Sequence, residues 1–272
     1  MKQYQDLVRN VIDNGTLKQN RTGVDTLCYF GYHYKVDLSE GFPLLTTKKI
    51  YFSSVIRELL WYLSGETHIR NLREYTKIWD AWTSEEKNWE IGKMYGYQWT
   101  HWEKFTETDT PGLYEKSYIN QIKDAIDLLK NSPDSRRIVV TAWNPSVLDE
   151  IALPSCHSFF IFNVINGKLN CHLTQRSGDI GLGIPFNLAC YAALTQMIAQ
   201  EVNLELGEFS HYINDAHIYV NHIDGLKEQL EREPMDLPNL TIAKKPFWDL
   251  EFDDFKLENY NHHPAIKFEV AV

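Results

Sequence analysis

The chain has 272 residues, of which 43% are hydrophobic and 13% aromatic, enough to bury the core of one domain. Its formal net charge of −10 argues against a general nucleic-acid-binding surface, which needs a basic stripe, but allows a local arginine cluster for a small anion. Because there is no low-complexity tract, apolar signal region, membrane-length apolar run or Cys-x-x-Cys pair, we expect a single cytoplasmic domain over residues 1–272.

The first half of the chain alternates helical and strand patterns. Apolar spacing predicts a helix over Tyr4–Asn14, and strict alternation predicts a strand over Leu27–Asp37. A second helix is predicted over Phe52–Ser64. Phe105–Tyr114 is polar and contains a Pro-Gly turn signal, which predicts a surface loop, and Tyr118–Leu129 has the spacing of an amphipathic helix.

The second half is richer in strands. Asn166-Gly167 favours positive φ and predicts a hairpin turn between two strand-like runs. The expected elements are strands over Ile138–Ala142, Ser158–Ile165, Lys168–Thr174 and Phe209–Tyr219, and helices over Pro185–Val202 and His222–Glu231. The fold class that this order predicts is α+β, with a mostly antiparallel or mixed sheet packed by several helices.

The stretch Leu153–Asn187 concentrates groups that could perform chemistry. Cys156 is a candidate nucleophile, and a guanidinium such as that of Arg176 would raise its thiolate fraction if the hairpin closes. Asn187 adds a neutral amide at the start of the following helix. From the residues alone, the favoured interpretation of Cys156 is a small buried apolar side chain, the usual fate of a free cysteine.

Ordered motifs along the whole chain resemble the thymidylate synthase family. Three lie in the central stretch: Leu-Pro-Ser-Cys-His at 153–157, Gln-Arg-Ser-Gly-Asp at 175–179 and Gly-Leu-Gly-Ile-Pro-Phe-Asn at 181–187. Further matching motifs are residues 21–23, 42–49, 58–61, 78–80, 134–137, 215–219 and the terminal Val270-Ala271-Val272. The resemblance favours a nucleophilic role for Cys156.

The resemblance implies reductive methylation of dUMP by 5,10-methylenetetrahydrofolate, giving dTMP and dihydrofolate through a covalent bond between Cys156 and C6 of the base. It implies that Arg176 lowers the thiol pKa and meets the phosphate, and that Asn187 reads uracil rather than cytosine. Asp179 is expected to bond the pterin. Tyr95 and Glu58, with water, are expected to relay the proton from C5, whereas His157 is expected to support the site without transferring a proton.

The family's binding residues also transfer onto this sequence, and no metal is expected. The residues implied for dUMP are Arg21, Arg136, Arg137, Gln175, Arg176, Ser177, Gly178, Asp179, Asn187, His217 and Tyr219. Those implied for the folate are Tyr51, Trp79, Trp82, Asp179, Leu182, Gly183, Phe186 and Ala271. The resemblance further implies a homodimer in which Arg136 and Arg137 reach the phosphate bound by the partner chain.

Several of these residues also have ordinary structural interpretations. Glu58 could belong to a satisfied network, Trp79 and Trp82 could be core aromatics, and His217 and Tyr219 could pack across strands. Arg136 and Arg137 could be a surface pair, since neighbouring strand residues point to opposite faces. The sequence departs from common family patterns at Tyr51, Lys93, Met94, Thr100 and Ser155, which affects local loop contacts but removes no catalytic group.

Other functions compete with thymidylate synthesis. The nearest is a dUMP hydroxymethylase of the same superfamily, in which water captures the methylene and tetrahydrofolate is released. A dCMP enzyme is disfavoured because such members place an acid where Asn187 stands. A thiol hydrolase built on Cys156 would leave the arginines unexplained, and a catalytically silent interaction protein would leave the filled reactive positions unexplained.

Overall fold

The fold is α+β and is built on a mixed sheet, as the sequence predicts. The computed structural model describes residues 1–271, so Val272 of the terminal motif lies outside the described residues. The helices are α1 Lys2–Asn14, α2 Phe52–Ser64, α3 Arg70–Arg73, α4 Gly96–Thr100, α5 Gln121–Asn131, α6 Gly183–Val202 and α7 Ile223–Leu230. The strands are β1 Thr16–Lys18, β2 Thr26–Asp37, β3 Trp102–Glu107, β4 Tyr114–Ile119, β5 Val139–Thr141, β6 His157–Ile165, β7 Lys168–Asp179, β8 Glu205–Tyr219, β9 Asn239–Ile242 and β10 Phe255–Glu258.

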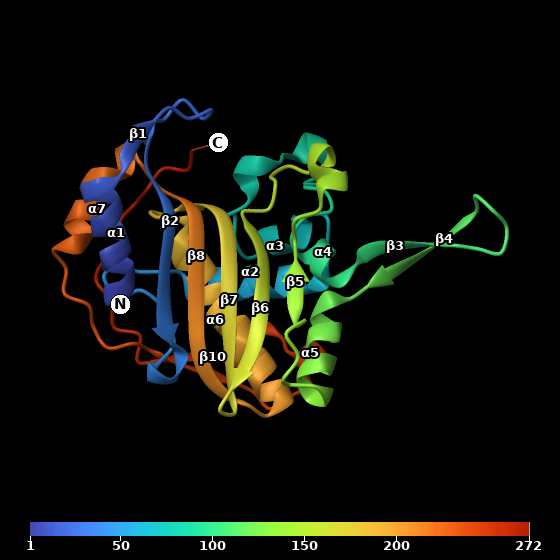
Figure 1. Ribbon diagram of the computed structural model, residues 1–272. Coiled ribbons are helices and arrows are strands. Elements are labelled where there is room, and N and C mark those ends of the chain that lie inside the picture. Colours follow the sequence, from blue (N-terminus) through green and yellow to red (C-terminus); the bar gives the residue numbers. More distant parts are fainter. Residues whose placement is uncertain (272) are drawn as a thin grey trace.

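The main sheet has six strands in the order β1-β2-β8-β7-β6-β5. Neighbouring strands are antiparallel except β7 and β8, which are parallel. A parallel pair requires a crossover, and the long helix α6 supplies it between β7 and β8. Figure 1 shows α6 and α2 behind the sheet, with the opposite face of the central strands free of helices.

Alternation along the strands separates a buried face from a partly exposed one. One cross-strand row consists of Phe160, Leu173, His211 and Tyr34, all of which are buried. Helix α6 packs against this face and is buried almost all round, beyond the single apolar stripe expected from its sequence. The principal core therefore lies between the sheet and the helices behind it.

The hairpin of β6 and β7 forms as predicted. Asn166 has φ 52° and Gly167 has φ 75°, the backbone conformation that a tight two-residue turn requires. Strand β7 continues past the predicted end at Thr174 to Asp179, because its carboxyl-terminal residues pair with β8. This extension carries the Gln-Arg-Ser-Gly-Asp motif into the sheet.

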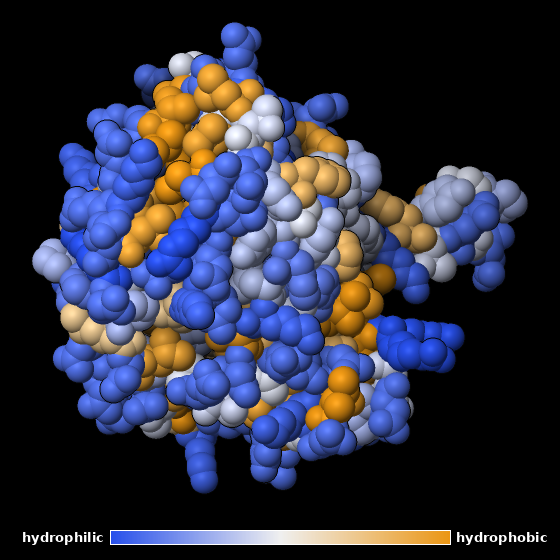
Figure 2. Space-filling model, turned by 60° about the vertical axis from the view of Figure 1, so that its left-hand side comes forward, coloured by the Kyte–Doolittle hydropathy of each residue, from blue (hydrophilic) through white to orange (hydrophobic). Residues whose placement is uncertain are grey.

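The prediction of a loop over Phe105–Tyr114 is wrong at both ends. Residues up to Glu107 and from Tyr114 onward pair as the antiparallel strands β3 and β4, and only the tip between them is a turn. Figures 1 and 2 show this hairpin standing clear of the body of the molecule. Its side chains are mostly exposed on both faces, so its sequence lacks the apolar alternation that reveals a half-buried strand.

Other predicted bounds differ by a few residues. Helix α5 begins at Gln121 instead of Tyr118, because Asn120 caps it by accepting the Lys123 N–H at 2.9 Å. The helix predicted from His222 begins with a short 3-10 turn, and α7 starts at Ile223. No helix of residues 1–271 has the length and apolar character needed to cross a membrane.

Candidate active site

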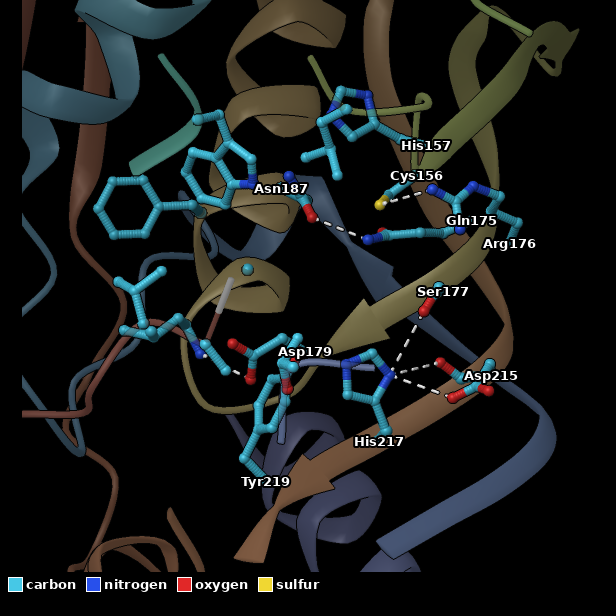
Figure 3. Close-up of a pocket in the computed structure, with 18 of the residues that line it drawn as sticks. Cys156, His157, Gln175, Arg176, Ser177, Asp179, Asn187, Asp215, His217 and Tyr219 are labelled. Carbon is cyan, nitrogen blue, oxygen red and sulfur yellow. Dashed lines mark hydrogen bonds and ion pairs between the residues drawn. The ribbon is translucent and has the colours of Figure 1, made fainter. Parts of the chain in front are cut away.

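The motif residues meet at one end of the sheet because of strand direction. The parallel strands β7 and β8 both end there, and their register sets Ser177 beside Asp215 and Asp179 beside His217. Strand β6 runs antiparallel to β7, so its beginning lies at the same end, with His157 paired to Gln175. Cys156 immediately precedes β6 and is thereby placed next to the carboxyl-terminal part of β7 (Figure 3).

A cavity of about 550 Å³ opens at this end of the sheet. Most of the predicted site residues line it: Arg21, Tyr51, Glu58, Trp79, Trp82, Tyr95, Cys156, Gln175, Arg176, Ser177, Asp179, Leu182, Gly183, Phe186, Asn187, His217, Tyr219 and Ala271. These residues come from segments spread over nearly the whole chain. The cavity thus has the concave, mixed polar and apolar lining of a small-molecule site.

Cys156 is held by contacts on both its backbone and its thiol. Its N–H donates to the hydroxyl of Tyr95 at 2.8 Å, and Nη2 of Arg176 lies 3.5 Å from its Sγ. The same guanidinium donates to the carbonyls of Pro154 and Ser155, at 2.5 and 3.0 Å, which fixes it beside the sulfur. The predicted approach of Arg176 to Cys156 is therefore present in the structure.

The pKa of the Cys156 thiol is set by opposing effects. Burial raises the pKa of Cys156, and although Arg176, a hydrogen bond with Tyr95 and the charge of Arg21 oppose this effect, the net pKa lies above its ordinary value. The predicted lowering of the thiol pKa by Arg176 is therefore present, but burial outweighs it. The physical reason is that the free energy lost when the thiolate is removed from water exceeds the electrostatic stabilisation that one partly solvated guanidinium provides.

Tyr95 occupies a strained position beside Cys156. Its φ of 35° and ψ of −101° lie outside the regions favoured by L-residues, and its side chain is buried. Its ring stacks on that of His157 with centroids 4.0 Å apart. His157 in turn contacts the Tyr191 hydroxyl through Nδ1 at 2.7 Å, and burial lowers its pKa to about 3, so it stays neutral and unsuited to donating a proton.

Glu58 of α2 is a buried carboxyl group on the cavity wall. Its Oε1 accepts the indole N–H of Trp79 at 2.7 Å. Burial raises its pKa to about 7, an effect that hydrogen bonds from Trp79 and Tyr62 only partly offset. A carboxyl group of this kind can take up and release a proton near neutral pH.

Asn187, near the start of α6, points its amide toward the strand ends. Its Oδ1 accepts a hydrogen bond from Nε2 of Gln175 at 2.9 Å (Figure 3). Asp179 uses one carboxylate oxygen to accept the N–H groups of Gly181 and Leu182, at 2.8 and 3.3 Å. Its other oxygen has no hydrogen-bond partner within residues 1–271 and is available to a ligand.

A sequence model of the family described as Thymidylate synthase matches residues 2–272. The chain belongs to the thymidylate synthase family. Enzymes of this family are methyltransferases that bind dUMP and use methylenetetrahydrofolate as co-substrate. In the part of the chain that the structure describes, no cluster of His, Cys, Asp or Glu side chains is arranged to hold a metal ion.

The aromatic residues assigned to the folate by the family pattern differ in exposure. Trp79 is buried and Trp82 half-buried, with ring centroids 5.1 Å apart, so the pair is both part of the core and part of the cavity wall. Tyr51 is 55% exposed and lies on the cavity wall. Ala271 lines the same cavity near the carboxyl terminus.

Three residues of the family pattern do not line the cavity. Gly178 is buried within β7, where a Cβ would lie 2.5 Å from Cδ1 of Ile184, so this position accepts only glycine without a shift. Arg136 and Arg137 are both exposed and precede β5. Neither guanidinium forms an ion pair or hydrogen bond with any other residue of the described chain.

Asp215 is a cavity residue that the sequence reasoning did not single out. Its carboxylate accepts from Nδ1 of His217 at 3.1 Å and from the Lys18 ammonium at 3.0 Å. These bonds hold the pKa of Asp215 well below its ordinary value. The signal was present in the sequence, because Asp215 stands two residues before His217 and strand residues at that spacing share a face.

Proposed function

We propose that this protein is a thymidylate synthase that converts dUMP and 5,10-methylenetetrahydrofolate to dTMP and dihydrofolate. The observation that carries the proposal is that the Cys156 thiol, the Arg176 guanidinium and the Asn187 amide line one cavity. A nucleophile, a cation and a base-reading amide in one space suit covalent catalysis on an anionic pyrimidine nucleotide. The formal net charge of the chain is −10, so binding of an anion depends on a local cluster of cations such as Arg21 and Arg176 in this cavity.

The first step is addition of Cys156 to C6 of the uracil ring. Deprotonated Sγ forms the S–C6 bond, and the electrons of the C5–C6 double bond move toward O4, so C5 becomes nucleophilic. Arg176 favours the thiolate and, with Arg21, Ser177 and the partner's arginines, meets the phosphate. Asn187 bonds N3–H and O4, where negative charge develops.

The cavity also fits the folate co-substrate. Trp79, Trp82, Leu182 and Phe186 supply apolar walls for a flat ring system, and the free oxygen of Asp179 supplies an acceptor for its polar edge. When bound, methylenetetrahydrofolate supplies both the one-carbon unit and the hydride. The apolar walls exclude water, which favours hydride capture of the methylene over hydration.

Proton removal from C5 is assigned to Glu58 and Tyr95. Glu58 has a pKa of about 7 and can exchange a proton near neutral pH. Within residues 1–271 no hydrogen bond joins its carboxyl to the Tyr95 hydroxyl, so the relay between them requires bridging water. We assign the sugar hydroxyl to His217 and Tyr219, whose rings lie 5.4 Å apart at the end of β8.

We further propose that the enzyme is a homodimer formed through the face of the sheet opposite α6. The cross-strand row of Phe159, Thr174, Tyr212 and His33 occupies this face and is half-buried or exposed, with no helix over it. A second copy would cover these apolar and aromatic groups. It would also give Arg136 and Arg137, which are outside their own chain's cavity, a phosphate to bind.

The decisive experiment is incubation with dUMP and methylenetetrahydrofolate, followed by mass analysis of the nucleotide and the folate. The proposal expects dTMP and dihydrofolate. Hydroxymethyl-dUMP with tetrahydrofolate would instead identify a hydroxymethylase, and absence of any product would refute both. Cys156→Ser is the matched control: it should abolish turnover and retain dUMP binding, because an alcohol occupies similar space but is a far weaker nucleophile.

A further inference from the structure

A chain of buried hydrogen bonds runs from the cavity into the core behind it. Gln175 donates from Nε2 to Asn187 and accepts at Oε1 from Nε2 of His211, both at 2.9 Å. The other ring nitrogen of His211, Nδ1, lies 2.8 Å from the hydroxyl of Tyr34. Tyr34, His211 and Gln175 are each at most 7% exposed, and the two hydrogen bonds that His211 makes lie in the core, where water does not compete for them.

The donors and acceptors in this series of hydrogen bonds have one consistent direction. Burial raises the pKa of Tyr34 and lowers that of His211 to about 3, so a neutral phenol faces a neutral imidazole. A neutral imidazole donates from one nitrogen and accepts at the other. Since the Tyr34 hydroxyl has no other partner within residues 1–271, its proton goes to Nδ1, and Nε2 carries the hydrogen that Gln175 accepts.

We infer that Tyr34 and His211 are positioning residues that set the orientation of the Asn187 amide and thereby the choice of pyrimidine. This inference rests on the proposed substrate. Uracil presents a carbonyl acceptor beside an N–H donor, whereas cytosine presents an amino donor beside a ring-nitrogen acceptor. An asparagine amide turned by 180° exchanges its own donor and acceptor, so a single fixed orientation matches only one of the two bases.

This series of hydrogen bonds fixes the orientation of the Asn187 amide, because each bond determines the donor and acceptor of the next. Tyr34 selects the His211 tautomer with hydrogen on Nε2, which requires Oε1 of Gln175 to face the ring. Nε2 of Gln175 must then face Asn187 and bond its Oδ1, which leaves the Asn187 amino group directed elsewhere. Without the phenol proton, either tautomer leaves Nδ1 unpaired, and hydrogen bonding no longer selects one of them.

The substitution Tyr34→Phe tests this inference while keeping the ring in the core. Dissociation constants of dUMP and dCMP would be measured by calorimetry for the wild type and the variant. We expect the preference for dUMP over dCMP to fall about tenfold, the value of one buried hydrogen bond. The matched control is Tyr32→Phe, which removes a hydroxyl from the same face of β2. Tyr32 takes no part in the hydrogen bonds from Tyr34 to Asn187, so this variant should keep the wild-type preference for dUMP over dCMP.

A second measurement needs no substrate. Nitrogen-15 NMR of the wild-type imidazoles should find His211 with hydrogen on Nε2, and in Tyr34→Phe this signal should change toward a mixture of tautomers. Hydrogen on Nδ1 in the wild type, or an unchanged base preference in Tyr34→Phe, would overturn the inference. If the wild type bound no dUMP, the proposed function would fail, and the tautomer measurement would still decide whether the chain has this direction.

Discussion

Glu58 should make the stability of the folded enzyme fall as the pH rises. Its pKa is raised from an ordinary 4.5 to about 7 by burial, so in the folded protein the carboxyl group holds its proton over a pH range in which the unfolded chain releases it. A folded-state pKa above the unfolded one contributes stability that is complete below about pH 4.5 and is lost as the pH rises through 7. The window is therefore pH 4.5 to 7.

The size of the effect follows from the same two values. Each tenfold difference in proton affinity is worth about 1.4 kcal/mol, so the interval between 4.5 and about 7 corresponds to about 3 kcal/mol. The side chain is only 6% exposed, and solvent screening therefore reduces this figure little. Glu58→Gln keeps the shape and the acceptor for the Trp79 N–H but has no ionisable proton.

The assay is urea unfolding of the wild type and Glu58→Gln at a series of pH values, evaluated as the difference between their free energies of unfolding. Comparing the two proteins cancels the contributions of other titrating groups, including His157 and His211, whose lowered pKa values make stability rise with pH. The free energy of unfolding of Glu58→Gln minus that of the wild type should increase by about 3 kcal/mol between pH 4.5 and 8.

A matched control is Glu74→Gln, which neutralises an exposed carboxylate near the next helix and should show no comparable growth. A difference between Glu58→Gln and the wild type that stays constant within about 1 kcal/mol across this range would refute the reasoning. A difference that decreases with pH would mean that the ionised carboxylate, instead of the neutral one, is favoured in the fold.

Three further predictions address the site and the stability of the fold. Asn187→Asp should shift binding toward dCMP, because a protonated acid can donate to the cytosine ring nitrogen; competition between dUMP and dCMP measures this, and unchanged discrimination would assign base reading to another group. Arg136→Ala, Arg137→Ala chains and Cys156→Ser chains should each be inactive alone, but their refolded heterodimers should recover up to half the activity per dimer; verified heterodimers without activity would place the arginines in their own chain's site. Gly96→Ala should destabilise the fold by at least about 2 kcal/mol, because a Cβ there would lie 1.9 Å from the Tyr62 carbonyl oxygen, and urea unfolding close to the wild type would contradict that contact.

The sequence by itself determined the elements whose signals are local. Helix α2 spans Phe52–Ser64 as predicted, because its apolar spacing and the following Gly65, in the left-handed conformation, are properties of that segment alone. The turn at Asn166-Gly167 likewise depends on the two residues that form it. Cys156 and most of the other cavity residues could be named from the sequence because they lie in motifs that resemble the family, although their assembly into one cavity could not.

Tertiary structure decided the features that depend on contacts between distant segments. The parallel pairing of β7 and β8 extends β7 to Asp179 and brings Asp215 and His217 to it, and no local pattern encodes that pairing. The raised pKa values of Cys156 and Glu58 arise because other segments remove these groups from water. The link from Tyr34 through His211 joins strands far apart in sequence, and each residue taken alone resembles ordinary core, so only their packing could reveal it.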